Sequence, residues 1–90
     1  MNQIATTMIK LMKSNNITHI WYGDIVIIEK CAMLCNLHHL HPKKRIQTVL
    51  NSLDRSDFFV KSYIRSDFSG RNRKYRCFTI KNYSSTDVSN

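Results

Sequence analysis

The chain has 90 residues, of which 42% are hydrophobic, and its formal net charge at pH 7 is +8. This length predicts one small domain with no room for a second core. No stretch approaches the ~20 apolar residues of a membrane span, so we expect no membrane association. The sequence contains three cysteines, an odd number that argues against a disulfide framework and favours a reducing cytoplasm.

Residues 3–14 contain apolar side chains at helical spacing. Ile4, Met8, Leu11 and Met12 fall on one face, which predicts a helix over this range. The pair Asn15–Asn16 is a plausible stop signal after it. Residues 17–22 are β-branched and aromatic, and this composition predicts a short strand.

Gly23 and Asp24 then separate two apolar runs. We predict a second helix over residues 25–37 with Asp24 as its cap, because the segment continues in good helix formers. Ile28, Cys31 and Cys35 form its apolar stripe. The alternative is a hairpin in which Gly23–Asp24 is the turn and residues 25–28 are a strand.

The third predicted helix is the most clearly amphipathic segment. Residues 38–41 connect to Pro42, which suits the first position of a helix because its missing N–H has no partner there. The inward stripe is Ile46, Val49, Leu50 and Leu53, spaced at helical intervals. The outward face is basic and amide-bearing: Lys43, Lys44, Gln47, Thr48, Asn51 and Arg55.

The last third of the chain predicts an antiparallel hairpin. Residues 58–65 and 74–81 are strand-like, and the segment between them contains the turn signal and basic residues. Residues 83–90 are polar, and we expect them to form a flexible tail.

The positive charge is confined to the second half of the chain. Residues 1–40 have a net charge of +1, whereas residues 41–81 have a net charge of +8. A localised positive field favours a polyanionic partner.

This order of elements resembles the winged helix-turn-helix family of small bacterial, plasmid and phage regulators. Residues 41–81 show the resemblance: an amphipathic basic helix, an apolar pair and a two-stranded wing. The resemblance implies an α+β fold with three helices, a short strand and a C-terminal β-hairpin wing. We expect this winged-helix domain to span residues 1–82, followed by the tail of residues 83–90.

The family resemblance implies a DNA-binding transcriptional regulator whose partner is double-stranded DNA. A major groove admits one α-helix, and amide side chains in it can read adenine. The expected contacts from the third helix are Lys43, Lys44, Arg45, Gln47, Thr48 and Asn51. Those from the wing, to phosphates or the minor groove, are Arg65, Arg71, Arg73, Lys74 and Arg76. We expect a monomer or weak homodimer that can become dimeric on DNA.

Two other partners fit the sequence. RNA would require aromatic side chains exposed on the sheet, and Tyr63, Tyr75 and Phe78 are the candidates, although core packing of at least two of them is expected. A protein partner would make the chain an interaction module, such as a phage-type inhibitor of a host protein. Trp21 and Tyr22 could anchor such a partner, but we expect Trp21 to pack between the first helix and the sheet.

Metal binding and catalysis have weaker support. Cys31, Cys35, His38, His39 and His41 lie within eleven residues, but zinc sites usually combine two well-separated ligand pairs. Cysteines on an apolar stripe more often behave as small buried hydrophobes. The sequence shows no paired carboxylates, nucleophile elbow or phosphate-cradling glycine loop. We therefore expect no cofactor, no metal and no enzyme activity.

Overall fold

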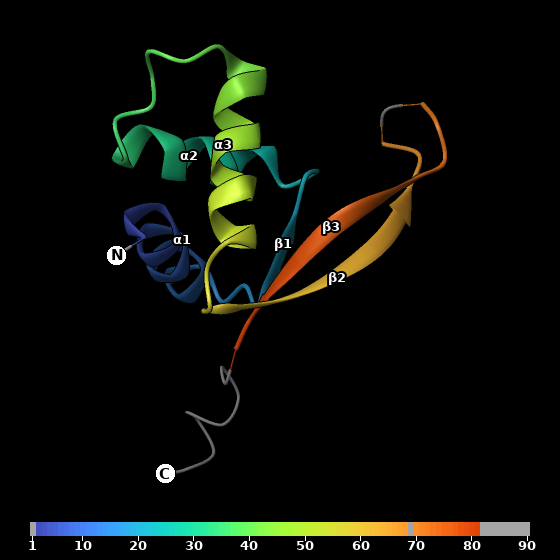
Figure 1. Ribbon diagram of the computed structural model, residues 1–90, viewed down its shortest axis with the longest axis horizontal. Coiled ribbons are helices and arrows are strands. Elements are labelled where there is room, and N and C mark those ends of the chain that lie inside the picture. Colours follow the sequence, from blue (N-terminus) through green and yellow to red (C-terminus); the bar gives the residue numbers. More distant parts are fainter. Residues whose placement is uncertain (1, 69, 82–90) are drawn as a thin grey trace, which may run out of the picture.

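Three helices and a three-stranded antiparallel sheet make up the described chain, which in this computed structural model comprises residues 2–68 and 70–81. The helices are α1 (Gln3–Ser14), α2 (Ile25–Leu34) and α3 (Pro42–Asp54). The strands are β1 (His19–Trp21), β2 (Phe59–Ser66) and β3 (Arg73–Ile80), in the sheet order β1-β3-β2 (Figure 1). The predicted α+β class is confirmed. The predicted tail, residues 83–90, lies outside the described residues.

The first two helices end in the same way, at an asparagine with left-handed backbone. Asn16 has a φ of 57°, and Asn36 has a φ of 61°. The next residue then turns back: Ile17 N donates to the Met12 carbonyl oxygen at 2.8 Å, and Leu37 N donates to that of Ala32 at 2.9 Å. Such a bond satisfies a free carbonyl group of the last helical turn, and an apolar contact usually accompanies it. α1 therefore ends where predicted, whereas α2 ends at Leu34 rather than residue 37.

A tight turn joins β1 to α2. Residues 25–28 are helical, as predicted, and the alternative in which they form a strand is wrong. β1 is shorter than the predicted strand over residues 17–22. Asp24 occupies the N-cap position, but its carboxylate accepts a hydrogen bond from Trp21 N at 3.0 Å instead of bonding to the helix. A Cβ on Gly23 would lie 2.2 Å from Cζ2 of Trp21, so the ring leaves room only for glycine.

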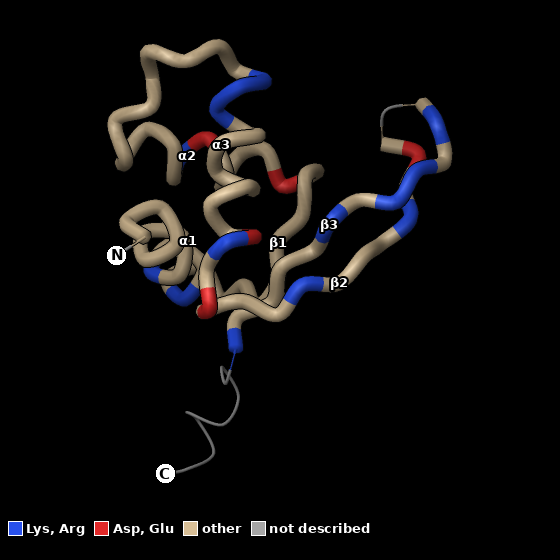
Figure 2. Tube along the Cα trace, in the orientation of Figure 1, with Lys and Arg blue, Asp and Glu red and all other residues tan. Residues whose placement is uncertain are grey.

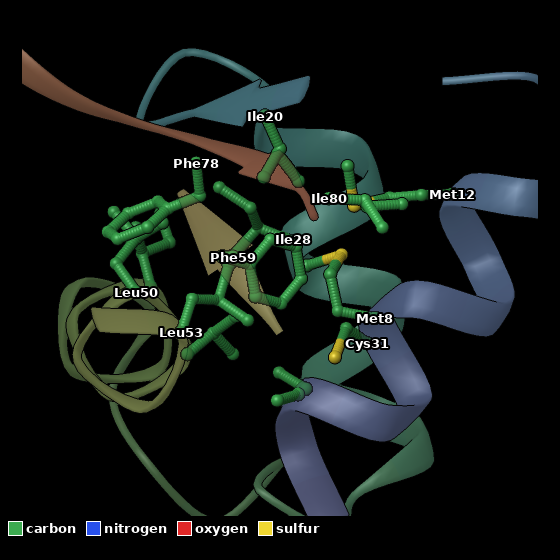
Figure 3. Packing of buried hydrophobic residues seen from close by; sticks show 14 residues of the cluster. Met8, Met12, Ile20, Ile28, Cys31, Leu50, Leu53, Phe59, Phe78 and Ile80 are labelled. Atoms are coloured by element: carbon green, nitrogen blue, oxygen red, sulfur yellow. The ribbon is translucent and has the colours of Figure 1, made fainter. Parts of the chain in front are cut away.

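The core lies between the three helices and one face of the sheet. The predicted inward stripe of α3 (Ile46, Val49, Leu50 and Leu53) is buried. Figure 3 shows Leu50 and Leu53 against Phe78 of β3 and Phe59 of β2. The same cluster includes Met8, Met12, Ile20, Ile28, Cys31 and Ile80. Burial, with a smaller effect from Cys35, raises the pKa of the Cys31 thiol to about 12.

Trp21 does not pack between α1 and the sheet, so that prediction is wrong. Ile20 takes the core-facing position and is fully buried. Successive strand residues point to opposite faces, and the Trp21 ring instead packs edge-on against Phe68 and Tyr75, at centroid distances of 5.6 and 5.5 Å. The single tryptophan therefore supports the hairpin rather than the core.

The hairpin of β2 and β3 extends well beyond the helices (Figure 1). Its register runs from Phe59 opposite Ile80 to Ser66 opposite Arg73, which confirms the predicted antiparallel pair. Phe59, Phe78 and Ile80 at the near end are buried in the core. Farther out, the same face continues past the helices and carries polar and charged residues.

Candidate nucleic-acid interface

A cleft of about 530 Å³ lies between α3 and the hairpin. α3 forms one wall and β2 and β3 form the other, while the turn after β1 contributes a tyrosine. The lining residues are Tyr22, Lys43, Gln47, Leu50, Tyr63, Arg73, Lys74, Tyr75 and Arg76. The cleft therefore combines cations, tyrosine rings and one amide side chain.

The α3 wall begins at the positive end of the helix. Lys43 and Gln47 are one turn apart, and both side chains are exposed. Pro42 occupies the first turn, as predicted, together with Lys43 and Lys44. The helix dipole contributes about half a positive charge at this end, and the lysines add to it. The result is a local field that attracts anions.

The hairpin wall owes its composition to strand alternation. In the register, Tyr63 is opposite Arg76 and Arg65 is opposite Lys74, so these four side chains share the face that continues from the core. Nζ of Lys74 lies 5.4 Å from the centroid of the Tyr63 ring, a cation–π distance. Figure 2 shows basic residues along the hairpin and at the start of α3.

An aromatic cluster of Trp21, Tyr22, Phe68 and Tyr75 supports the outer part of the hairpin. Tyr22 lies 5.7 Å from both Phe68 and Tyr75, measured between ring centroids, and the Trp21 contacts are similar. All of these pairs except the tilted Tyr22–Tyr75 pair are edge-to-face. Edge-to-face pairs at such distances stabilise by about 0.5–1.5 kcal/mol beyond area burial. The cluster connects the projecting hairpin to the turn between β1 and α2.

Asp54 at the end of α3 joins the helix to the base of the hairpin. Its carboxylate lies 2.6 Å from Lys61 Nζ and 2.9 Å from Arg76 Nη1. These two cations hold the pKa of Asp54 below its usual value, and Lys61 has the larger effect. Asp54 in turn raises the pKa of Lys61. Nη2 of Arg76 also donates to Asn51 Oδ1 at 3.2 Å.

Arg45 is held inside the helical part of the domain. Its Nε lies 2.7 Å from Glu29 Oε1 on α2, and its Nη1 donates to the Leu40 carbonyl oxygen at 2.6 Å. The side chains of Arg45 and Glu29 are only 14% and 24% exposed. Arg45 therefore connects α3 to α2 and to the loop before α3.

The predicted contact residues separate into distinct groups. Those that line the cleft are Lys43, Gln47, Arg73, Lys74 and Arg76. Those that are exposed outside its lining are Lys44, Asn51, Arg65 and Arg71, whereas Thr48 and Arg45 are partly buried. Nη1 of Arg65 donates to Asn72 Oδ1 at 3.4 Å within the hairpin.

The contact residues expected from the sequence did not include the three tyrosines that line the cleft, or Lys61 of β2, which pairs with Asp54. The alternation of Lys61, Tyr63 and Arg65 along β2 was a usable signal, because residues two apart share one face of a strand. Tyr22 had no comparable signal, since its place in the cleft depends on the turn between β1 and α2.

The cysteines and histidines do not come together as a metal site. Cys31 and Cys77 are buried, Cys35 is partly buried, and the three histidines of the connecting loop are exposed. Within residues 2–68 and 70–81, no three His, Cys, Asp or Glu side chains are grouped as metal ligands.

None of the described helices is both long and apolar enough to cross a bilayer. Comparisons of this chain with protein-family models, curated proteins and solved structures give no match.

Proposed function

We propose that this protein is a small DNA-binding transcriptional regulator of winged helix-turn-helix type. The order helix, strand, helix, helix, hairpin supports the proposal because it is the arrangement that the family resemblance implies. In this proposal α3 enters the major groove and the hairpin acts as the wing.

The observation that carries the proposal is the basic cleft between α3 and the hairpin. A duplex lying across it would meet Lys43 on one side and Arg73 and Lys74 on the other. Such contacts to phosphates supply affinity and orientation, whereas contacts to base edges supply specificity. Gln47 is the lining residue suited to base contacts.

Three of the expected contacts take different roles in this proposal. Arg45 positions α3 through Glu29, so it supports the interface without touching DNA. Arg76 and Asn51 bond to each other, and Asp54 neutralises part of the positive charge of Arg76. The remaining basic side chains of α3 and the hairpin are therefore the principal DNA contacts.

The proposal is tested by titrating labelled duplexes with the protein at several salt concentrations. We expect the logarithm of the binding constant to fall linearly with the logarithm of salt concentration, by about 0.9 for each phosphate neutralised. Selection from a random duplex pool then identifies the preferred site, and half-site symmetry reports whether two copies bind. Absence of duplex binding at low salt would refute the proposal.

A second candidate is a protein-interaction module, favoured by exposed apolar residues on α2. Val26 is 85% exposed and Leu34 is 57% exposed, although both are large hydrophobic side chains. Exposed apolar groups on a helix are candidates for a protein contact. A stoichiometric protein partner that stays bound after nuclease treatment, and is lost in Val26→Ser/Leu34→Ser, would support this candidate.

A further inference from the structure

Tyr63 is an exposed aromatic residue in the basic cleft. Its side chain is 57% exposed, whereas Phe78 is fully buried in the core and the Tyr75 ring packs against Trp21 and Tyr22. Of the three aromatic residues that could stack on a base, Tyr63 is therefore the one that neither the core nor the aromatic cluster explains.

The surroundings of Tyr63 are those of a site for a nucleotide. Lys74 Nζ lies near its ring, and Arg76 is its cross-strand neighbour. Lys43 and Gln47 line the same cleft from α3. Sites that bind single-stranded nucleic acid combine a basic groove for the backbone with aromatic rings on which bases stack. The cleft volume of about 530 Å³ is also within the range of about 300–1,000 Å³ that is usual for small-ligand sites.

We infer that the cleft binds an unpaired base, stacked on the Tyr63 ring, with the adjoining phosphates on Lys43, Arg73 and Lys74. In a fully paired duplex each base is stacked between its neighbours, so a tyrosine ring can stack only on a base that is unpaired or extruded. The preferred ligand is then a duplex with an unpaired nucleotide, and a single strand presents the same unpaired base without the duplex contacts. This inference rests on the proposed nucleic-acid binding and names the form of nucleic acid bound.

The test uses three probes of one sequence: a fully paired duplex, the same duplex with one unpaired 2-aminopurine, and the single strand with 2-aminopurine. The proteins are wild type, Tyr63→Phe, Tyr63→Ala and the control Phe58→Ala. Phe58 is 47% exposed and is not among the lining residues of the cleft. Affinity is measured by anisotropy, stacking by quenching of 2-aminopurine fluorescence, and folding of each variant by circular dichroism.

We expect wild type, Tyr63→Phe and Phe58→Ala to bind the duplex with one unpaired base more tightly than the paired duplex, and to quench 2-aminopurine in both probes that contain it. Tyr63→Ala should lose the quenching and weaken binding to those probes by about 5- to 150-fold, because base–aromatic stacking is worth about 1–3 kcal/mol. Its affinity for the paired duplex should change less than about twofold, since no stacking is lost there.

Equal wild-type affinity for all three probes would overturn the inference, as would quenching by Tyr63→Ala or an equal loss for paired and unpaired probes. In each of these outcomes the wild-type protein still binds the paired duplex, so the proposed function stands. Failure of the wild type to bind the paired duplex at low salt would instead refute the proposed function.

Discussion

Lys44 and Arg45 are adjacent basic residues of α3 with different environments. Lys44 is exposed, whereas Arg45 is largely buried and is paired with Glu29. Charge and position along the chain do not distinguish them, because both lie near the start of an amphipathic basic helix. The direction of each side chain around the helix decides which one can reach a ligand.

For single residues, we predict that Arg45→Ala lowers the stability of the protein and that Lys44→Ala does not. Arg45→Ala should lower the free energy of unfolding by about 1–3 kcal/mol, because it leaves Glu29 without its cation and removes a bond to a carbonyl oxygen. Lys44→Ala should leave stability within about 0.5 kcal/mol of wild type, since it is an exposed surface residue. The unfolding free energy is measured by urea denaturation.

Duplex titrations of the same two variants complete the comparison. Lys44→Ala should weaken binding and reduce the salt slope by about 0.9, as one phosphate contact is lost. If Arg45→Ala is as stable as wild type but fails to bind, then Arg45 contacts DNA directly and its assignment as a positioning residue is wrong.

Among the helices and strands, α3 is connected to the hairpin through Asp54, which forms ion pairs with two basic residues of the hairpin, Lys61 and Arg76. Lys61 and Arg76 cannot bind phosphate fully while they are paired with this carboxylate. Partly exposed ion pairs contribute only about 0–1 kcal/mol to stability. We therefore expect the effect of Asp54 on the charge presented to DNA to exceed its effect on folding.

For Asp54→Asn we predict tighter duplex binding and a salt slope up to about 1.8 steeper, because two cations become available for phosphates. Asp57→Asn is the matched control, since it removes the same charge from an exposed residue of the turn after α3. The measurement is duplex affinity between about 50 and 200 mM salt. A weaker or unchanged salt slope in Asp54→Asn would show that the ion pairs serve only to hold the hairpin.

At the scale of the whole molecule, the basic residues lie along the hairpin and at the start of α3 (Figure 2). α1 also carries two exposed lysines, Lys10 and Lys13, but it does not line the cleft. If α3 and the hairpin form the interface, then the position of a charge, and not the net charge of +8, determines binding.

Two double variants separate position from net charge. Arg71→Ala/Arg73→Ala should weaken binding to all duplex sequences and reduce the salt slope by up to about 1.8. Lys10→Ala/Lys13→Ala removes the same charge from α1, and we expect less than about a threefold loss of affinity, since only long-range attraction is reduced. Equal losses in the two variants, measured by the same titrations, would indicate nonspecific attraction to the whole protein.

The positions of the helices and of the hairpin could be predicted from the amino-acid sequence because their patterns are local. Helical spacing located α1 and α3, the Asn15–Asn16 pair marked the end of α1, and Pro42 marked the start of α3. The end of α2 at Leu34 was harder to predict. It depends on the left-handed conformation of Asn36 and on the hydrogen bond from Leu37 N to the Ala32 carbonyl oxygen.

Which of the predicted contact residues are paired with other side chains depends on how the helices and strands pack. Arg45, Asn51 and Arg76 have partners 16 to 25 residues away in the sequence, so no local pattern could reveal them. The same holds for the packing of Trp21 on Phe68 and for the cleft that brings Tyr63 near α3. Periodicity reports which face of an element is apolar, whereas pairing between distant residues depends on how the elements pack against one another.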